Sequence, residues 1–201
     1  GGKLVVAALL SCALCAACAH REARRAAAVP GRPDAPPPVA SKQDAPEART
    51  PSGPLREAPA FELRDQFRDT HTISFPREGL LGLGIADRHC AHDGDPWNDA
   101  VRERYGARID LCGVAALEDI PFWWRPLVRP VLRRYVEEPI LLDWHNELAA
   151  RYRFRPECVN VYIIAPDGTI LLRLFGKARP AKLRRLYTVV DAWLEEQAPD
   201  S

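Results

Sequence analysis

A nearly continuous apolar run at residues 80–86 limits the folds that are open to this chain. A strand with apolar residues at successive positions is typical of a sheet that is covered on both faces. Strand patterns at 108–114, 139–143 and 159–164 follow it, and helical patterns separate them. The sequence therefore predicts an α/β three-layer sandwich with a mixed central sheet, which is parallel at first and antiparallel at its end.

β-Hairpins are predicted at both ends of this domain. Residues 61–67 and 71–75 alternate apolar and polar side chains, and the three residues between them form a turn. At the other end, Pro166-Asp167-Gly168 joins strand 159–164 to strand 169–175. This turn is expected because Pro sets φ and Gly permits a positive φ.

Helices are expected at residues 95–105, 125–137, 146–152 and 181–196. In the first of them, Asp95 is the expected N-cap and Pro96 the first helical residue. Pro130 either interrupts the second helix or marks its start. The last helix places its apolar side chains on one stripe, which is typical of a helix that covers a sheet: Leu183, Leu186, Val189, Val190, Trp193 and Leu194.

The first 57 residues differ in composition from the rest. Nine of the 19 prolines lie between Pro30 and Pro59, and three of the six cysteines lie among the first 18 residues. Residues 19–57 have too few large apolar side chains to offset the entropy of ordering, so we predict a disordered Pro/Ala-rich tether there. The predicted organisation is a signal peptide at 1–18, the tether at 19–57 and one folded domain at 58–198.

The N-terminal apolar run at residues 4–14 is typical of a secretory signal peptide. After it, Cys15-Ala16-Ala17-Cys18 resembles a bacterial lipobox, whose cysteine is lipidated after cleavage. Residues 9–12 fit the same pattern, so Cys18 or Cys12 is the acceptor, and Cys18 is preferred because it leaves the longer apolar run. A signal peptide removed without lipidation is the alternative. The resemblance implies export and a lipid anchor on a periplasm-facing membrane, the outer membrane in preference to the inner.

Charge is nearly balanced over the domain but not over residues 122–136. From Ala60 onward there are 20 Lys and Arg against 22 Asp and Glu, which does not support nucleic-acid binding. Within 122–136, apolar residues recur at helical spacing with four arginines between them. Such a pattern occurs in interfacial membrane helices and in partner-binding helices, and also in ordinary helices that cover a sheet. Residues Phe122–Val136 are therefore the candidate surface for an envelope protein partner.

Three motifs in the folded part resemble the redoxins, the thioredoxin-like group that includes alkyl hydroperoxide reductases and thiol-specific antioxidant proteins. Residues 59–67 resemble the opening "P-x-F-x-L-x-D-x-x-G", residues 142–147 the "D-x-x-G-E" and residues 163–176 the "I-D-x-D-G-x-I … G" of that group. The resemblance spans residues 58–197. It implies a thioredoxin-like fold with a reactive dithiol after strand 80–86, where a helix N-terminus lowers the pKa of a cysteine.

At the dithiol position, however, the chain reads Cys90-Ala91-His92-Asp93, so Asp93 replaces the second cysteine. The upstream pattern of peroxiredoxins is missing, and Val159 stands where a proline normally precedes the strand that faces the dithiol. Ordinary dithiol exchange and peroxidase activity are therefore not implied. What remains is a thiol-dependent oxidoreductase of antioxidant type, with residual or specialised chemistry and without the usual dithiol.

In the thioredoxin-like arrangement, the start of strand 159–164 lies beside the end of strand 80–86, which brings Cys158 near Cys90. We predict that these two cysteines form a redox pair, with His89 or His92 assisting thiolate formation and Cys112 as a third partner. The predicted catalytic residues are Cys90, Cys158, His92 and Asp93.

Two alternatives to the redox pair stay open. In the first, the cysteines are inert and the domain is a non-catalytic binding module for an envelope partner. In the second, His89, Cys90 and His92 hold copper or zinc with Cys158 as a fourth ligand, as in a copper-handling redoxin. The prediction includes no bound cofactor.

Overall fold

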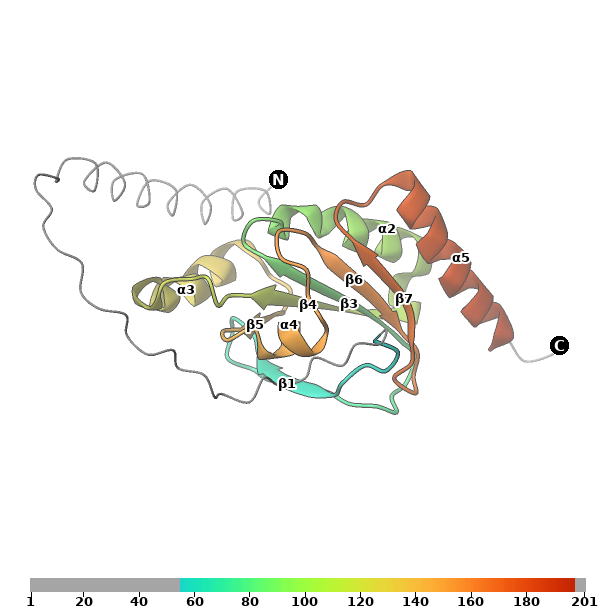
Figure 1. Cartoon of the computed structure of the whole chain (residues 1–201), viewed down its shortest axis with the longest axis horizontal. Helices are drawn as coiled ribbons and strands as arrows, with labels where there is room; N and C mark the ends of the chain where they lie inside the picture. Colours follow the sequence, from blue (N-terminus) through green and yellow to red (C-terminus); the bar gives the residue numbers. More distant parts are fainter. Residues whose placement is uncertain (1–54, 198–201) are drawn as a thin grey trace, which may run out of the picture. The chain divides into compact units, whose positions relative to one another are not determined.

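The computed structural model describes residues 55–197 (Figure 1). The predicted signal peptide, both candidate lipid acceptors and most of the predicted tether lie outside these residues. The strands are β1 (Phe61–Arg64), β2 (Thr70–Ile73), β3 (Leu80–Asp87), β4 (Ile109–Ala116), β5 (Ile140–Asp143), β6 (Asn160–Ile164) and β7 (Ile170–Phe175). The helices are α2 (Asp95–Tyr105), α3 (Arg125–Tyr135), α4 (Glu147–Arg151) and α5 (Pro180–Glu196), with short 3-10 turns η1 (Ala91–Asp93), η2 (Gly106–Arg108) and η3 (Phe122–Trp124).

Five strands form the central sheet in the order β5-β4-β3-β6-β7, and β1 and β2 form a separate hairpin. β4 runs parallel to both β3 and β5, whereas β6 is antiparallel to β3 and β7. The mixed α/β sheet and the N-terminal hairpin predicted from the sequence are confirmed. Both crossovers, β3-α2-β4 and β4-α3-β5, step in the same direction, so right-handed connections place α2 and α3 on the same face of the sheet.

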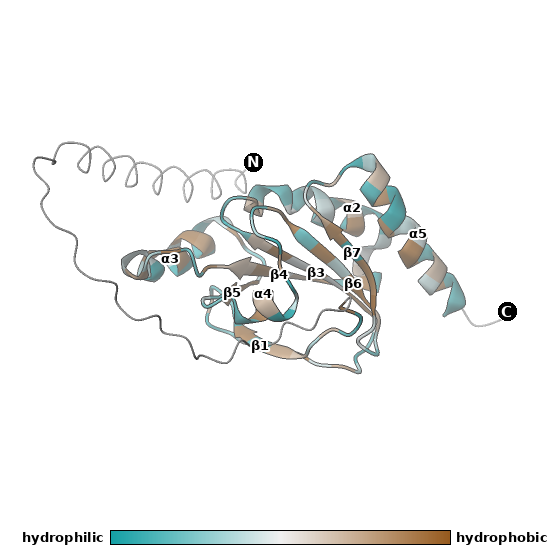
Figure 2. Ribbon diagram, viewed as in Figure 1, coloured by the Kyte–Doolittle hydropathy of each residue, from teal (hydrophilic) through white to brown (hydrophobic). Residues whose placement is uncertain are grey.

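The two faces of the sheet carry separate apolar cores, and hydrophobic residues gather in its strands (Figure 2). Leu81, Leu83 and Ile85 of β3 point to the face covered by β1 and α4. Leu80 points to the other face, where α2 and α5 pack, with Trp97 and Leu186 among its buried neighbours. Because successive residues of a strand point to opposite faces, this double burial explains the continuous apolar run. A third cluster lies beneath α3.

Several local predictions need correction. Helix α2 begins at Asp95 itself, because Gly94 is the N-cap whose carbonyl accepts N–H bonds from Trp97 and Asn98. β4 starts and ends later than predicted, at 109–116. Pro130 lies inside α3 and neither starts nor ends it: the helix loses one N–H bond there and continues to Tyr135.

The domain begins slightly before residue 58. The carbonyl of Arg56 accepts an N–H bond of 2.8 Å from Ile170, and Glu57 forms an antiparallel bridge with Thr169. Leu55 also packs against the core. Within residues 55–197, the helices are too short or too polar to cross a bilayer.

Candidate functional site

The carboxylate of Asp87 organises the loop that follows β3. Asp87 is the last residue of β3 and is 8 % exposed. Its Oδ1 accepts N–H bonds from His89 at 2.9 Å and from Cys90 at 3.2 Å. Its Oδ2 accepts a third bond of 2.7 Å from the backbone N–H of Glu157. An Asp that accepts from the amides two and three residues further on forms a local turn, so one carboxylate fixes both the Cys90 loop and the loop before β6.

Cys90 lies in this loop as a buried thiol, 2 % exposed. Burial, and second the negative charge of Asp87, raise the pKa of Cys90 to about 12. Backbone N–H groups at a helix start normally stabilise a thiolate, but here the amide of Cys90 is bonded to Asp87. The segment that follows, η1, has only three residues. Cys90 is therefore protonated at neutral pH.

Cys158 lies at the same end of the sheet as Cys90, as expected. Ile85 pairs with Asn160, and continuing this antiparallel register places Asp87 opposite Cys158. Neither thiol forms a disulfide bond. The two cysteines lie close enough together that the charge of a Cys158 thiolate contributes to the raised pKa of Cys90. The Sγ of Cys158 donates to the carbonyl of Arg155 at 3.4 Å. The redox pairing of Cys90 with Cys158 stays a prediction.

Cys112 does not belong to this end of the sheet. It lies in the middle of β4 opposite Leu83, and it packs with the core on the face away from Cys90. Burial raises its pKa to about 12. Cys112, the predicted third redox partner, therefore lies away from the Cys90 end of the sheet, because β4 extends four residues beyond it.

The histidines of the loop contact carboxylates. His92 Nε2 lies 3.1 Å from Asp93 Oδ1, which is also 3.8 Å from Lys177 Nζ. His89 Nε2 lies 3.5 Å from Asp119 Oδ2. Among residues 55–197, no group of three or more His, Cys, Asp and Glu side chains could hold a metal ion, so the copper alternative gains no support.

An open groove of about 540 Å³ adjoins the Cys90 loop on the α2 and α3 face. Gly84 of β3 and Gly113 of β4 are direct cross-strand partners, and a β-carbon at either position would meet no atom within 4 Å. The walls come from both helices and include Trp97, Val101, Val128 and Leu132. Sequence reasoning missed this groove, although the glycines within an otherwise apolar strand were a signal for it.

A charged pair bridges the two sides of the groove. Arg102 of α2 donates to Glu138, which follows α3, with Nη2 and Oε2 2.6 Å apart. Both side chains are partly exposed, so this pair contributes little to stability. The remaining groove lining is mostly apolar, which suits an apolar guest with a polar rim.

Comparison with known proteins shows the fold. Neither a family model nor a curated protein matches the chain. Among solved structures, a protein assigned as the thiol:disulfide interchange protein DsbE of Chlorobium tepidum aligns over 68 % of this chain and 94 % of its own, with 18 % identity and a TM-score of 0.54. The chain has a thioredoxin-like fold.

Two further neighbours agree. The exposed lipoprotein thioredoxin Etrx1 of Streptococcus pneumoniae covers 66 % of this chain and 99 % of its own, with 15 % identity and a TM-score of 0.52. StoA of Bacillus subtilis covers 68 % and 99 %, with 13 % identity and a TM-score of 0.52. The thioredoxin-like fold, which this chain shares with these neighbours, is thus combined here with a single cysteine, Cys90, where the redoxin resemblance implies two.

Proposed function

We propose that this thioredoxin-like domain is a non-catalytic binding module for a protein partner in the cell envelope. The observation that carries the proposal is the burial of Cys90 next to the Asp87 carboxylate: burial first, and then the negative charge of Asp87, raise the pKa of the thiol. With a pKa of about 12, the Cys90 thiol is almost entirely protonated at pH 7, whereas the thiolate is the nucleophile in disulfide exchange. Asp93 supplies no resolving thiol.

The groove between α2 and α3 is the proposed binding place for apolar side chains of the partner. Its volume lies in the range of ordinary ligand pockets, and its floor at Gly84 and Gly113 is bare backbone. An apolar side chain that enters there removes both its own surface and the groove wall from water. The groove thus replaces the dithiol as the functional feature of this end of the fold.

Thiol-disulfide chemistry of antioxidant type at Cys90 is the second candidate function. It is favoured by the register of β3 and β6, which brings Cys158 opposite Asp87 and close to Cys90. In this candidate, a partner that displaces Asp87 from the Cys90 amide lowers the pKa of the thiol. His92 and Asp93, the other predicted catalytic residues, lie in the same loop.

Export and anchoring are proposed with this function. The lipobox resemblance supports lipidation at Cys18, with Cys12 as the other acceptor, and a position on a periplasm-facing membrane. Etrx1, one of the structural neighbours, is described as an exposed lipoprotein. Incorporation of a labelled fatty acid that Cys18→Ser abolishes will support the anchor at that residue. Label retained in that variant and lost in Cys12→Ser moves the site.

Site-directed photocrosslinking in cells tests the binding function. A benzoylphenylalanine at Val136, a half-buried groove residue that follows α3, is introduced into the full chain with and without Gly84→Leu. We expect one discrete adduct, and at least fivefold less of it when leucine fills the groove. Ala150→Leu, which adds the same side chain at an exposed position of α4, is the matched control. An adduct that Gly84→Leu leaves unchanged contradicts the proposed groove.

A further inference from the structure

The large apolar side chains exposed within residues 55–197 gather around the start of α3. Phe122 and Trp123 of η3 are 83 % and 64 % exposed, and Leu127 in the first turn of α3 is 51 % exposed. The fourth is Phe67, 37 % exposed, in the turn between β1 and β2. Single exposed apolar residues are common, but all four in one region indicate an interaction surface.

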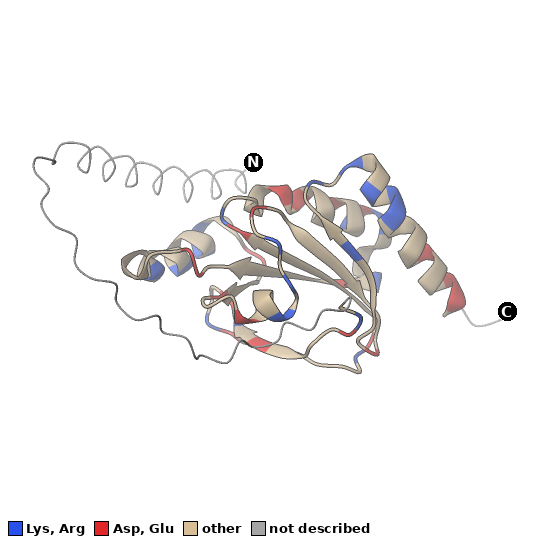
Figure 3. Ribbon diagram, viewed as in Figure 1, with Lys and Arg blue, Asp and Glu red and all other residues tan. Residues whose placement is uncertain are grey.

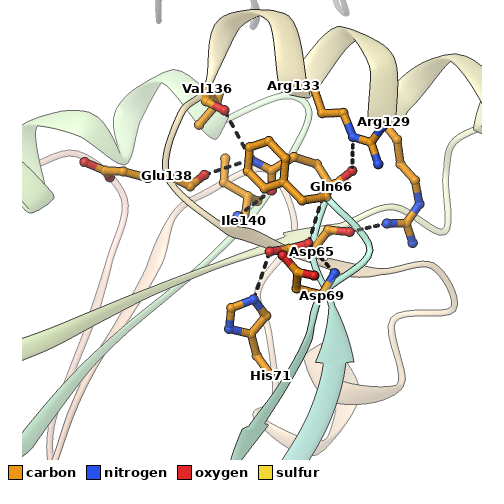
Figure 4. Close-up of polar contacts among 10 residues, drawn as sticks. Asp65, Gln66, Asp69, His71, Arg129, Arg133, Val136, Glu138 and Ile140 are labelled. Carbon is orange, nitrogen blue, oxygen red and sulfur yellow. Dashed lines mark hydrogen bonds and ion pairs between the residues drawn. The ribbon is translucent and has the colours of Figure 1, made fainter.

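Phe67 belongs to this region because α3 holds its turn in place (Figure 4). Arg129 donates to the carbonyl of Asp65, and Arg133 Nε donates to the carbonyl of Gln66 at 2.7 Å. The side chain of Gln66 in turn donates to the carbonyl of Glu138 at 2.8 Å, just after α3. The turn and the helix therefore form one continuous surface. We call it the α3 surface and define it as Arg64, Phe67, Arg68, Phe122, Trp123, Arg125, Leu127, Arg129, Arg133 and Arg134.

The α3 surface contains six arginines, and the exposed acidic residues next to it in sequence include Asp69 and Glu137. Helix α3 contains four arginines and no acidic residue (Figure 3). Arg125 donates to the carbonyl of Trp144, and Arg129 and Arg133 also donate to carbonyls, which leaves the positive charges in place. Burial and then the nearby positive charges of Arg68 and Arg133 lower the pKa of Arg129, against the opposite effect of Asp65. The α3 surface is therefore suited to bind an anionic ligand.

We propose that the α3 surface docks on an anionic phospholipid bilayer. The aromatic rings and Leu127 enter the interface between headgroups and acyl chains, and the guanidinium groups bind lipid phosphates. The inner face of α3 packs against the domain, where Val128 and Leu132 are buried. On its outer side, Leu127 continues the exposed apolar surface that Phe122 and Trp123 begin in η3, and arginines flank it, as in helices that lie in a membrane interface.

Charge complementarity favours a bilayer over a protein partner at this surface. An apolar protein interface is typically depleted of charge at its centre, whereas here arginines alternate with the exposed apolar residues along η3 and α3. Lipid phosphates, in contrast, meet arginines wherever these reach the headgroup layer. The docking does not depend on the groove, which lies on the inner side of α3.

Hydrogen exchange of the full chain bound to vesicles tests the docking. It reports protection of individual segments, so binding through the N-terminal segment does not hide the result at α3. Vesicles of phosphatidylglycerol and phosphatidylcholine at 3:7 are compared with pure phosphatidylcholine. We expect amides of residues 122–134 to exchange at least threefold more slowly on the anionic vesicles only. Trp123→Ser abolishes this protection. Arg134→Gln weakens binding about fivefold, since one arginine near an anionic surface contributes that factor.

The matched control is Arg185→Gln, which removes an exposed arginine of α5 outside the α3 surface. This variant keeps the protection. Protection that is equal on both kinds of vesicle, or absent from both, overturns the proposal. If lipid does not protect the α3 surface and a crosslinker at Trp123 captures one envelope protein, the surface is a protein interface. This outcome also overturns the proposal.

Discussion

Replacing Asp87 by Asn tests the account of Cys90 most directly. The substitution removes the negative charge next to the thiol and keeps an oxygen that can accept the N–H bonds of His89 and Cys90. Burial contributes most to the pKa of about 12, compared with 9.0 for an unperturbed thiol, and the charge of Asp87 comes second. We therefore expect the pKa of Cys90 to fall in the variant but to stay above 9.

The size of the effect follows from the thiolate fraction. Below its pKa, a thiol alkylates in proportion to that fraction, so each unit by which the pKa falls accelerates the reaction about tenfold. At pH 8 the wild-type thiolate is about one molecule in 10,000. A decrease of about one unit in Asp87→Asn predicts roughly tenfold faster alkylation at that pH.

The assay follows iodoacetamide alkylation of the full chain from pH 7 to pH 11, with the Cys90 peptide quantified by mass spectrometry. Asp93→Asn is the control, because it removes the same charge from the same loop at a residue whose carboxylate contacts His92 and Lys177. Circular dichroism checks folding, since the Asn amide cannot accept the N–H of Glu157. A wild-type rate that levels off near pH 8.5, or equal acceleration in both variants, refutes the role given to Asp87.

Three further predictions concern stability. Gly113→Leu fills open space and keeps the melting temperature within a few degrees. Gly82→Leu lowers it clearly, because a whole leucine side chain must fit at a buried position where a β-carbon already lies 2.8 Å from Leu111 and 3.5 Å from Ile109; thermal melts compare the two. Gln66→Ala leaves an N–H and two carbonyls unbonded in the interior and lowers the free energy of unfolding by about 2–4 kcal/mol in urea. Burial opposes ionisation of Asp65, but bonds from His71 and two backbone amides prevail and lower its pKa. Its contribution is therefore present above about pH 4 and lost as pH falls below that, so acid titration of Asp65→Asn shows a shallower loss.

The predictions that held rest on local patterns. Alternation at 61–75 and the Pro-Asp-Gly turn each specify a hairpin within a few residues, and the apolar run of β3 requires cover on both faces. The N-cap of α2 was misplaced by one residue because Gly94 caps through its carbonyl alone, without a side-chain bond. A sequence search for Asp, Asn, Ser or Thr before the helix does not find such a cap.

What the sequence could not supply depends on register and on long-range hydrogen bonds. Gly84 and Gly113 are 29 positions apart, and they form a groove floor only because β3 and β4 pair in one particular register. Asp87 acts on Glu157, which is 70 positions away, through one backbone amide. Gln66 resembles a surface turn residue in sequence, yet it is fully buried. Partners of this kind become visible only after the strands are paired.

The position of α3 connects the groove to the α3 surface. Arg133 and Gln66 fix this helix to the β1-β2 turn, and Gln66 also accepts the N–H of Ile140 at the start of β5. Because the helix is held from this side, its inner residues need not sink onto Gly84 and Gly113, and the groove stays open below them. The turn at Gln66 therefore serves both proposed binding surfaces, because it holds α3 in place and carries Phe67, which belongs to the α3 surface.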